Sequence, residues 1–292
     1  MSNSIHLYSV EPDGVRELPL QTPTKKVHEV MDGIQAGVYT GMRTFEGRRF
    51  LGLAEHMDRL ESSMSQMGYA LPLERGELRR GLDQVATRFA AKGEDSFLRV
   101  DVLPPGVQWM GGSSRTLITR GALSRVPAEF LQRGVQIAIA EDLRRHAPGI
   151  KTADFVLARR PYPIGTRECY EHLMVDDEGL LLEATSSNFY GILRGELRTA
   201  SDAVLAGITR RFLLFLCAGL EYHVNTKALH RSELPELEEA FLTSSTRGIV
   251  PVVTVDGIQI ADGIPGPKTR ALIKAYDVLT QRSAQPAWPP MD

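Results

Sequence analysis

The chain has 292 residues, a formal charge of −2 and 42% hydrophobic residues, so it can bury roughly three quarters of its unfolded surface in one large or two medium domains. The nearly neutral charge lacks the excess of positive charge typical of proteins that bind nucleic acids or anionic membranes. No hydrophobic run approaches the ~20 residues of a membrane span. The opening residues lack a secretion signal and both cysteines lie in apolar runs. We therefore expect a cytoplasmic protein with no nucleic-acid partner and no membrane partner.

The first part of the chain predicts a small α+β domain over residues 1–120, followed by a linker over 121–127. Apolar and polar residues alternate in the predicted strands, and the predicted helices carry one apolar face. Gly68 is the expected end of the first helix. In chain order, the predicted elements are strands over 37–45 and 48–53, helices over 55–67 and 77–91, and strands over 97–103 and 117–119.

Residues 128–292 predict a larger, β-rich domain with flanking helices, so the whole chain is predicted to be a two-domain α+β protein. A strand over 135–140 comes first, and buried strands over 180–182 and 189–193 follow, bounded by turn residues. An apolar helix over 212–218 comes next. The polar, Pro-containing end over 281–292 is expected to be a mobile tail.

Residues 181–210 indicate a cofactor site. Glu183 follows three leucines, where a charged carboxylate is costly unless a cation pairs with it. Gly207 and Thr209 stand where an apolar helix begins, and free N–H groups and the positive dipole end there suit a phosphate. These two features match the two ends of pyridoxal 5′-phosphate if a lysine lies between them. Among the lysines, Lys151 alone follows a strand-like run by a short link containing Pro and Gly.

Three sequence motifs resemble the class IV aminotransferase family. They are IKTADF around Lys151, EATSSNF from Glu183 onward, and LAGITR at the start of the helix, in that family's order and spacing. The resemblance implies the fold type IV of branched-chain aminotransferases, D-amino-acid aminotransferases and 4-amino-4-deoxychorismate lyases. It also implies pyridoxal 5′-phosphate as cofactor and a homodimer.

The resemblance assigns roles to single residues. Lys151 would bind the cofactor covalently and move the proton in catalysis, and Glu183 would keep the pyridine nitrogen protonated, unless Glu183 only pairs with a nearby arginine. Arg59, in HMDRL, would bind the phosphate, unless it is a plain surface arginine, and the adjacent His56 is interpreted as structural. The other implied cofactor-binding residues are Ser187, Asn188, Gly207, Ile208, Thr209, Ser245 and Thr246, and ordinary turn chemistry is an alternative for the last two.

Substrate binding is expected to involve an arginine, because an amino-acid substrate carries a carboxylate. Arg43 and Arg99 match positions where branched-chain enzymes keep arginines, although both could be structural. Tyr39 fits an aromatic wall of the pocket. Thr40 departs from the branched-chain pattern, which has glutamate there, and some lyase members carry threonine.

These observations predict a PLP-dependent aminotransferase that moves an amino group from an amino acid, with branched-chain L-amino acids favoured, to a 2-oxo acid. A 4-amino-4-deoxychorismate lyase and a D-amino-acid aminotransferase remain open alternatives. The sequence contains no GxSxG, CxxC or HExxH motif, so we expect neither those chemistries nor a metal.

Overall fold

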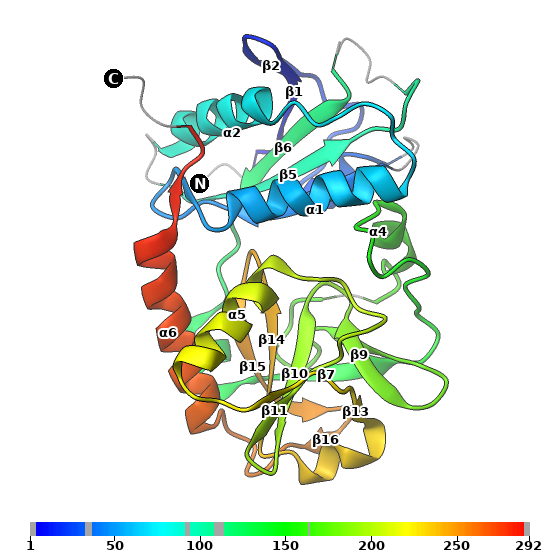
Figure 1. Cartoon of the computed structure of the whole chain (residues 1–292), viewed down its shortest axis with the longest axis vertical. Coiled ribbons are helices and arrows are strands. Elements are labelled where there is room, and N and C mark those ends of the chain that lie inside the picture. Colours follow the sequence, from blue (N-terminus) through cyan, green and yellow to red (C-terminus); the bar gives the residue numbers. More distant parts are fainter. Residues whose placement is uncertain (1–3, 33–36, 91–93, 108–113, 163, 289–292) are drawn as a thin grey trace. The chain divides into compact units, whose positions relative to one another are not determined.

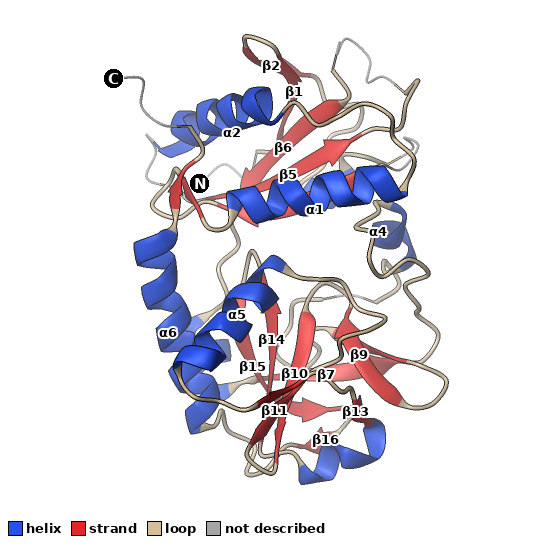
Figure 2. Cartoon of the chain, in the orientation of Figure 1, coloured by secondary structure: helices blue, strands red, loops and turns tan. Residues whose placement is uncertain are grey.

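A computed structural model describes residues 4–32, 37–90, 94–107, 114–162 and 164–288 of the chain and divides it into two compact units (Figure 1). The first unit contains Met1–Ser124, Ile150–Val156 and Thr280–Asp292, and the second contains Arg125–Gly149 and Leu157–Leu279. Helices and sheets occur in both units, which confirms the predicted α+β class (Figure 2). The domain boundaries predicted from sequence stay a prediction. The two compact units divide the chain differently, and the segment around Lys151 belongs to the first of them.

The first unit is built on an antiparallel sheet with the strand order β2-β1-β6-β5-β3. Helix α1 contacts β3, and helix α2 contacts β1, β2 and β6. Their apolar residues pack on the sheet in one buried cluster. The bounds are β1 His6–Glu11, β2 Gly14–Leu18, η1 Val27–Glu29, β3 Val38–Arg43, β4 Arg49–Phe50, α1 Leu53–Gln66, α2 Arg75–Ala90, β5 Ser96–Val102 and β6 Thr116–Ala122.

The predicted helices over 55–67 and 77–91 correspond to α1 and α2. The ends of these helices differ from the predicted ends by at most two residues. Gly68 has φ 72° just after α1, as expected of a helix end. The predicted strand over 48–53 is shorter. Gly52 takes a left-handed conformation with φ 64° and the helix already begins at Leu53, so only β4 remains.

The prediction of a mobile tail is wrong for residues 281–288. Helix α6, Pro267–Ser283, continues into the predicted tail, and β17, Gln285–Pro286, pairs with β4. Ala284 and Ala287 are buried. Arg49 donates hydrogen bonds to the carbonyls of Gln281 and Ala284 at 2.7 and 2.8 Å. Residues 289–292 lie outside the described part of the chain.

The second unit is built on a larger sheet with the order β12-β11-β10-β14-β15-β7-β8-β9-β13, and β16 pairs with β15. A further pairing of β9 with β10, at Glu183 and Asn188, closes the strands from β10 to β9 into a ring. Apolar residues of these strands form the core. The bounds are β7 Val135–Ala140, β8 His172–Val175, β9 Leu180–Ala184, β10 Asn188–Leu193, β11 Glu196–Arg198, β12 Val224–Asn225, β13 Leu229–His230, β14 Glu239–Ser244, β15 Gly248–Val255 and β16 Ile258–Gln259.

The remaining helices are α3 Ala128–Arg133, α4 Asp154–Ala158, α5 Ile208–Gly219 and η2 Arg231–Glu236. Helix α3 contacts β15, and α5 contacts β14. The carboxylate of Glu239 accepts hydrogen bonds from the backbone N–H groups of Lys268 and Thr269 at 3.0 and 2.7 Å. A residue of strand β14 thereby caps the first turn of α6.

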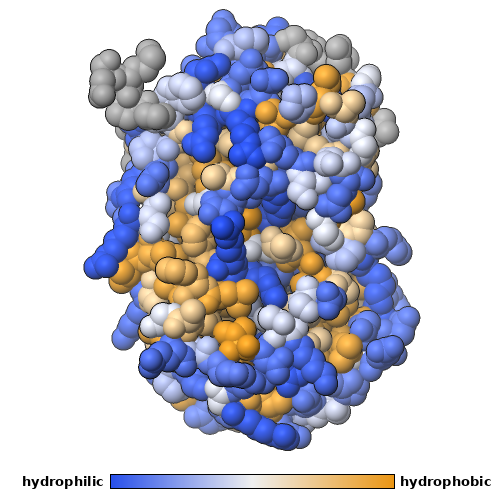
Figure 3. Space-filling view, viewed as in Figure 1, coloured by the Kyte–Doolittle hydropathy of each residue, from blue (hydrophilic) through white to orange (hydrophobic). Residues whose placement is uncertain are grey.

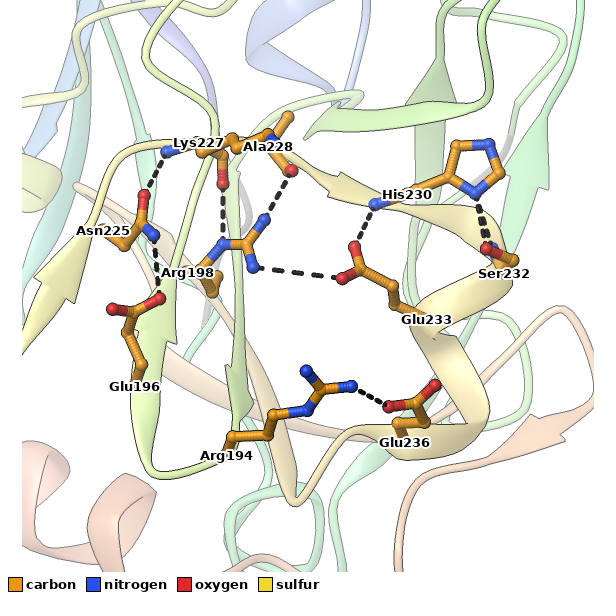
Figure 4. A network of polar contacts seen from close by, with 10 residues as sticks. All are labelled: Arg194, Glu196, Arg198, Asn225, Lys227, Ala228, His230, Ser232, Glu233 and Glu236. Atoms are coloured by element: carbon orange, nitrogen blue, oxygen red, sulfur yellow. Dashed lines mark hydrogen bonds and ion pairs between the residues drawn. The ribbon is translucent and has the colours of Figure 1, made fainter.

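A polar network fastens β11 to the chain from β12 to η2 (Figure 4). Arg198 donates to the carbonyls of Lys227 and Ala228 at 3.0 and 2.9 Å. Asn225 bridges the two segments, because its amide donates to the Glu196 carboxylate at 2.8 Å and its oxygen accepts from the Lys227 N–H. The backbone of Lys227 is therefore part of the scaffold.

Candidate active site

Lys151 lies in a segment that is hydrogen-bonded to the edge strand β3. The Tyr39 N–H donates to the Lys151 carbonyl at 2.9 Å, and the Ala153 N–H donates to the Gly37 carbonyl at 2.9 Å. From the other side, the Lys151 N–H donates to Ser63 Oγ of α1 at 3.3 Å. The backbone of the predicted cofactor lysine is thus fixed by a strand and by a helix of the same unit.

The aromatic ring of Tyr39 lies next to two cationic side chains. Lys151 Nζ is 4.8 Å and Arg99 Cζ is 4.2 Å from the ring centroid, both within the range of cation–π attraction. Tyr39 is only 4% exposed. The structure therefore brings together Lys151 and two of the three residues predicted to bind substrate.

Both predicted substrate arginines already have carboxylate partners. Arg99 is 1% exposed, its Nε donates to both oxygens of Asp101 at 3.0 and 2.8 Å, and its Nη2 donates to Asp101 Oδ1 at 2.6 Å. Arg43 Nη2 donates to Asp95 at 3.2 Å, and its guanidinium lies 4.6 Å from the Phe45 ring centroid. A substrate carboxylate that approached either arginine would share it with an aspartate.

Arg59 is hydrogen-bonded inside the first unit. Its Nη2 donates to Thr40 Oγ1 at 2.9 Å, and Thr40 Oγ1 lies 2.7 Å from His56 Nδ1. Thr40 and His56 are each 1% exposed. Burial, together with the positive charges of Arg59 and Lys151, holds the pKa of His56 well below its ordinary value. His56 is therefore neutral at physiological pH.

In the second unit, Glu183 of β9 and Asn188 of β10 lie opposite one another. Glu183 is 3% exposed, and its Oε1 accepts a hydrogen bond from Arg145 Nε at 2.7 Å. Its Oε2 accepts from the Asn188 amide at 3.3 Å, and that amide also donates to the Leu205 carbonyl at 2.9 Å. The alternative left open from sequence, an ion pair of Glu183 with an arginine, is present, and the partner is Arg145.

Gly207 precedes α5 and lies against Asn188. A Cβ at this position would lie 2.2 Å from Asn188 Oδ1, so no larger residue fits without a shift. Gly207 has no side chain to cap the N–H groups of the first turn, which belong to the buried Ile208 and Thr209 and their successor. The predicted phosphate residues of α5 thus lie beside the amide that contacts Glu183.

The turn between β14 and β15 contains the predicted residues Ser245 and Thr246 and is attached to the loop after β9 by Arg247. Arg247 Nη2 is 3.1 Å from the fully buried Glu171 carboxylate and donates to Ser186 Oγ at 2.8 Å. Ser187 Oγ donates to Glu171 at 2.7 Å. Because this bond uses its hydrogen, the Ser187 hydroxyl could only accept a bond from another group.

Sequence reasoning missed the partners of the predicted residues, namely Arg145, Asp101, Glu171 and Arg247. No spacing rule pairs a loop residue such as Arg145 with a strand residue 38 positions later. One signal was available. A carboxylate next to three leucines requires a cation, and the adjacent Arg144 and Arg145 stand in the loop that leads to Lys151.

The sequence profile of the family Amino-transferase class IV matches residues 37–255. The chain belongs to this family. It is therefore an enzyme that transfers amino groups, and its cofactor is pyridoxal 5′-phosphate.

The chain is similar to D-alanine aminotransferases and to branched-chain-amino-acid aminotransferases. The chain is 29% identical to a D-alanine aminotransferase of Bacillus licheniformis over 244 residues, which cover 80% of this chain and 84% of that one. It is also 29% identical to a branched-chain-amino-acid aminotransferase of Pseudomonas aeruginosa over 261 residues, which cover 82% of each chain. The crystal structure of a putative branched-chain amino acid aminotransferase from Thermotoga maritima matches with a TM-score of 0.75 at 24% identity, covering 95% of this chain and 96% of the other. These likenesses confirm the predicted fold type IV.

The described residues hold neither a group of three or more His, Cys, Asp and Glu that could bind a metal nor a helix with the length and hydrophobicity that a membrane crossing needs.

The Glu171 network generates a prediction about stability. Burial alone would raise the pKa of Glu171, but Arg247 and the hydrogen bonds from Ser186 and Ser187 together hold it below the ordinary 4.5. The carboxylate therefore stabilises the fold above pH 4.5, and this contribution is lost as the pH falls through the lower pKa of the folded state. Glu171→Gln leaves Arg247 without its buried counter-charge and should lower the free energy of unfolding at pH 7 by about 3 kcal/mol.

Urea unfolding of the wild type and the variant between pH 7 and pH 3 measures this difference, which should shrink below pH 4.5. The exposed Glu168 lies in the same segment, and Glu168→Gln is the matched control that should leave stability unchanged. A Glu171→Gln variant as stable as the control at pH 7 would contradict the structural role of this ion pair.

Proposed function

We propose that this aminotransferase takes the amino group of a branched-chain L-amino acid and passes it to a 2-oxo acid, with Lys151 as the catalytic lysine. The observation that carries the proposal is the position of Lys151. Its backbone is bonded to β3 and α1, and its ammonium group lies 4.8 Å from the Tyr39 ring centroid. A rigid backbone next to an aromatic wall suits a lysine that has to meet both a cofactor and an amino-acid substrate.

The residues of the second unit fit the chemistry of pyridoxal 5′-phosphate. A Cβ at position 207 would occupy the space beside Asn188 Oδ1, and glycine keeps that space open. No side chain of residue 207 caps the first turn of α5, so its N–H groups can donate to a phosphate. The acidic Glu183 is the group that the pyridine nitrogen requires, and Arg145 and Asn188 fix its two oxygens. The proposal assigns further phosphate contacts to Arg59, Ser245 and Thr246, and a place in the cofactor site to Ser187.

When bound, the cofactor draws electrons away from the substrate carbon that loses its proton. Lys151 Nζ accepts that proton and returns it, so one side chain acts as both base and acid. Glu183 holds a proton on the pyridine nitrogen. Arg145 orients Glu183, because its Nε donates a hydrogen bond to Oε1 at 2.7 Å.

The preference for branched-chain substrates is supported by the relatives with that name and by the wall around Tyr39. Arg99 in that wall is neutralised by Asp101, which favours an uncharged substrate side chain over an anionic one. A D-amino-acid substrate is a second candidate, because the D-alanine aminotransferase of Bacillus licheniformis matches at the same identity.

A homodimer and a cytoplasmic location complete the proposal. Figure 3 shows hydrophobic residues gathered over the region of α5 and α6. In these helices Phe215 is 69% exposed and Val278 is 45% exposed. A surface of this kind is typical of contact sites between proteins, and a second copy of the chain is the partner that we propose for it.

A panel of amino acids tests the proposed reaction. The holoenzyme is mixed with single L- and D-amino acids without an acceptor, and the change of the cofactor absorbance is followed. L-leucine, L-isoleucine and L-valine should react faster than their D-enantiomers and faster than L-glutamate. Faster reaction of D-alanine would replace the branched-chain assignment with the D-amino-acid one, and pyruvate release from 4-amino-4-deoxychorismate would indicate the lyase.

Reduction with borohydride should attach the cofactor to Lys151, as peptide mapping would reveal. Lys151→Ala should retain weak cofactor binding and lose at least ~1000-fold in turnover, because the covalent attachment and the proton carrier disappear together. Lys227→Ala and Lys268→Ala are the controls. Lys268 Nζ donates to the Gly195 carbonyl at 2.7 Å, so its replacement should leave the labelling unchanged. Label on either control lysine would refute the assignment.

Glu183→Gln keeps the shape of the side chain and removes its charge. The variant should still bind the cofactor, but turnover should fall by at least ~100-fold, because the loss acts on the transition state in which negative charge develops. Arg145→Met should cause a smaller loss of the same kind, with the same direction of change in the cofactor absorbance. Turnover of Glu183→Gln within a few-fold of wild type and an unchanged spectrum would make Glu183 a structural residue.

A further inference from the structure

Thr40, His56 and the half-buried Arg59 form a chain of hydrogen bonds between β3 and α1. Thr40 lies on the face of β3 opposite Tyr39, and His56 and Arg59 are one helical turn apart on α1. Thr40 Oγ1 is 2.9 Å from Arg59 Nη2 and 2.7 Å from His56 Nδ1. The threonine hydroxyl is therefore the link between the arginine and the histidine.

The direction of the hydrogen bonds in this chain follows from the chemistry of the three groups. A guanidinium only donates, so Thr40 Oγ1 accepts the bond from Arg59. Thr40 is 1% exposed, and His56 Nδ1 is the acceptor within reach of the hydroxyl hydrogen in the described part of the structure. A buried hydroxyl hydrogen without an acceptor is costly. Thr40 therefore donates to Nδ1, and His56 carries its ring proton on Nε2.

The electrostatics of the cluster agree with this direction. The charged groups that act on His56 are Arg59 and Lys151, both cationic, and together with burial they hold its pKa well below the ordinary value. A neutral imidazole leaves Nδ1 free to accept, whereas a protonated one would turn a second donor toward Thr40 Oγ1. Geometry and charge thus select one arrangement, in which Arg59 donates to Thr40 and Thr40 donates to His56.

We propose that Thr40 and His56 are positioning residues that fix the Arg59 guanidinium for the phosphate of the cofactor without touching the cofactor themselves. This inference rests on the proposed role of Arg59. An arginine side chain has many rotamers, and an anchored Nη2 restricts them before the ligand arrives. The Thr40 hydroxyl orients the guanidinium by accepting a hydrogen bond from Nη2.

The test compares pyridoxal 5′-phosphate with pyridoxal, which has the same aldehyde and ring but no phosphate. The protein is freed of cofactor, and the dissociation constants of both compounds are measured by absorbance. Arg59→Met should weaken binding of pyridoxal 5′-phosphate by ~30-fold or more and leave pyridoxal within ~2-fold. This reference variant tests the proposed role of Arg59.

Thr40→Val removes the hydroxyl and keeps the shape. It should weaken pyridoxal 5′-phosphate by ~10-fold and leave pyridoxal within ~2-fold, and Thr40→Ser should restore wild-type binding. His56→Asn places an amide oxygen near the position of Nδ1 and should bind nearly normally, whereas His56→Leu should resemble Thr40→Val. In the Arg59→Met background, Thr40→Val should have no further effect, because the two changes act on one contact.

Thr44→Val is the matched control, because Thr44 is also fully buried and hydrogen-bonded but contacts Asp95 and the Ser96 N–H instead of Arg59. It should leave the ratio of the two dissociation constants unchanged. If Arg59→Met also leaves that ratio unchanged, the phosphate role of Arg59 fails. If Arg59→Met changes the ratio and Thr40→Val does not, or if Thr40→Val weakens both compounds equally, the positioning role fails while the proposed function stands.

The inferred direction of the hydrogen bonds among Arg59, Thr40 and His56 can be tested separately, in a measurement that does not depend on the cofactor. Nitrogen NMR of the protein labelled at histidine should show His56 neutral, with its proton on Nε2, between pH 6 and pH 8. In Thr40→Val the Nδ1 signal should shift toward that of a nitrogen without a hydrogen bond. A proton on Nδ1 in the wild type would overturn the inferred direction of the chain.

Discussion

The backbone hydrogen bond from Tyr39 to Lys151 is the contact on which the proposed active site depends. Strand β3 is at the edge of its sheet, and an edge strand presents unpaired N–H and C=O groups to any extended segment. The segment around Lys151 occupies that edge. The same strand carries Tyr39 on one face and Thr40 on the other. The pairing register between β3 and the segment of Lys151 therefore sets where Lys151 lies relative to both residues. A slip by one residue would exchange the two faces.

Charged side chains of the proposed site and its surroundings form ion pairs with other residues of the protein. Glu183 has Arg145, Arg99 has Asp101, Glu171 has Arg247, and the half-buried Arg43 has Asp95. An isolated ion in a protein interior is too costly to persist. A ligand that binds such a residue therefore shares it with a partner or displaces that partner, and the net gain is smaller than a bare charge would give.

The sequence was sufficient for features that repeat locally or that form a motif. The 3.6-residue spacing of apolar residues predicted α1 and α2, Gly68 predicted the end of α1, and the three motifs predicted the family. It was insufficient for pairings between distant segments. Residues 150–156 fall inside the predicted second domain, 128–292, by their order in the sequence, yet the strand they pair with is β3. The end of the chain is polar and contains prolines, but two small alanines, Ala284 and Ala287, fill buried positions that composition does not reveal.

The division of the chain has a consequence for how the protein is made. The first unit begins at the N-terminus, but the segment that covers β3 comes at residues 150–156 and the strand that pairs with β4 comes at residues 285–286. A ribosome adding roughly 5–20 residues per second needs on the order of ten seconds or more to travel from residue 124 to residue 285. The edge at β3 stays uncovered until residues 150–156 have been synthesised, and β4 stays unpaired for the whole interval. The first unit of the growing chain can therefore complete its folding only after residues 285–286 have been synthesised.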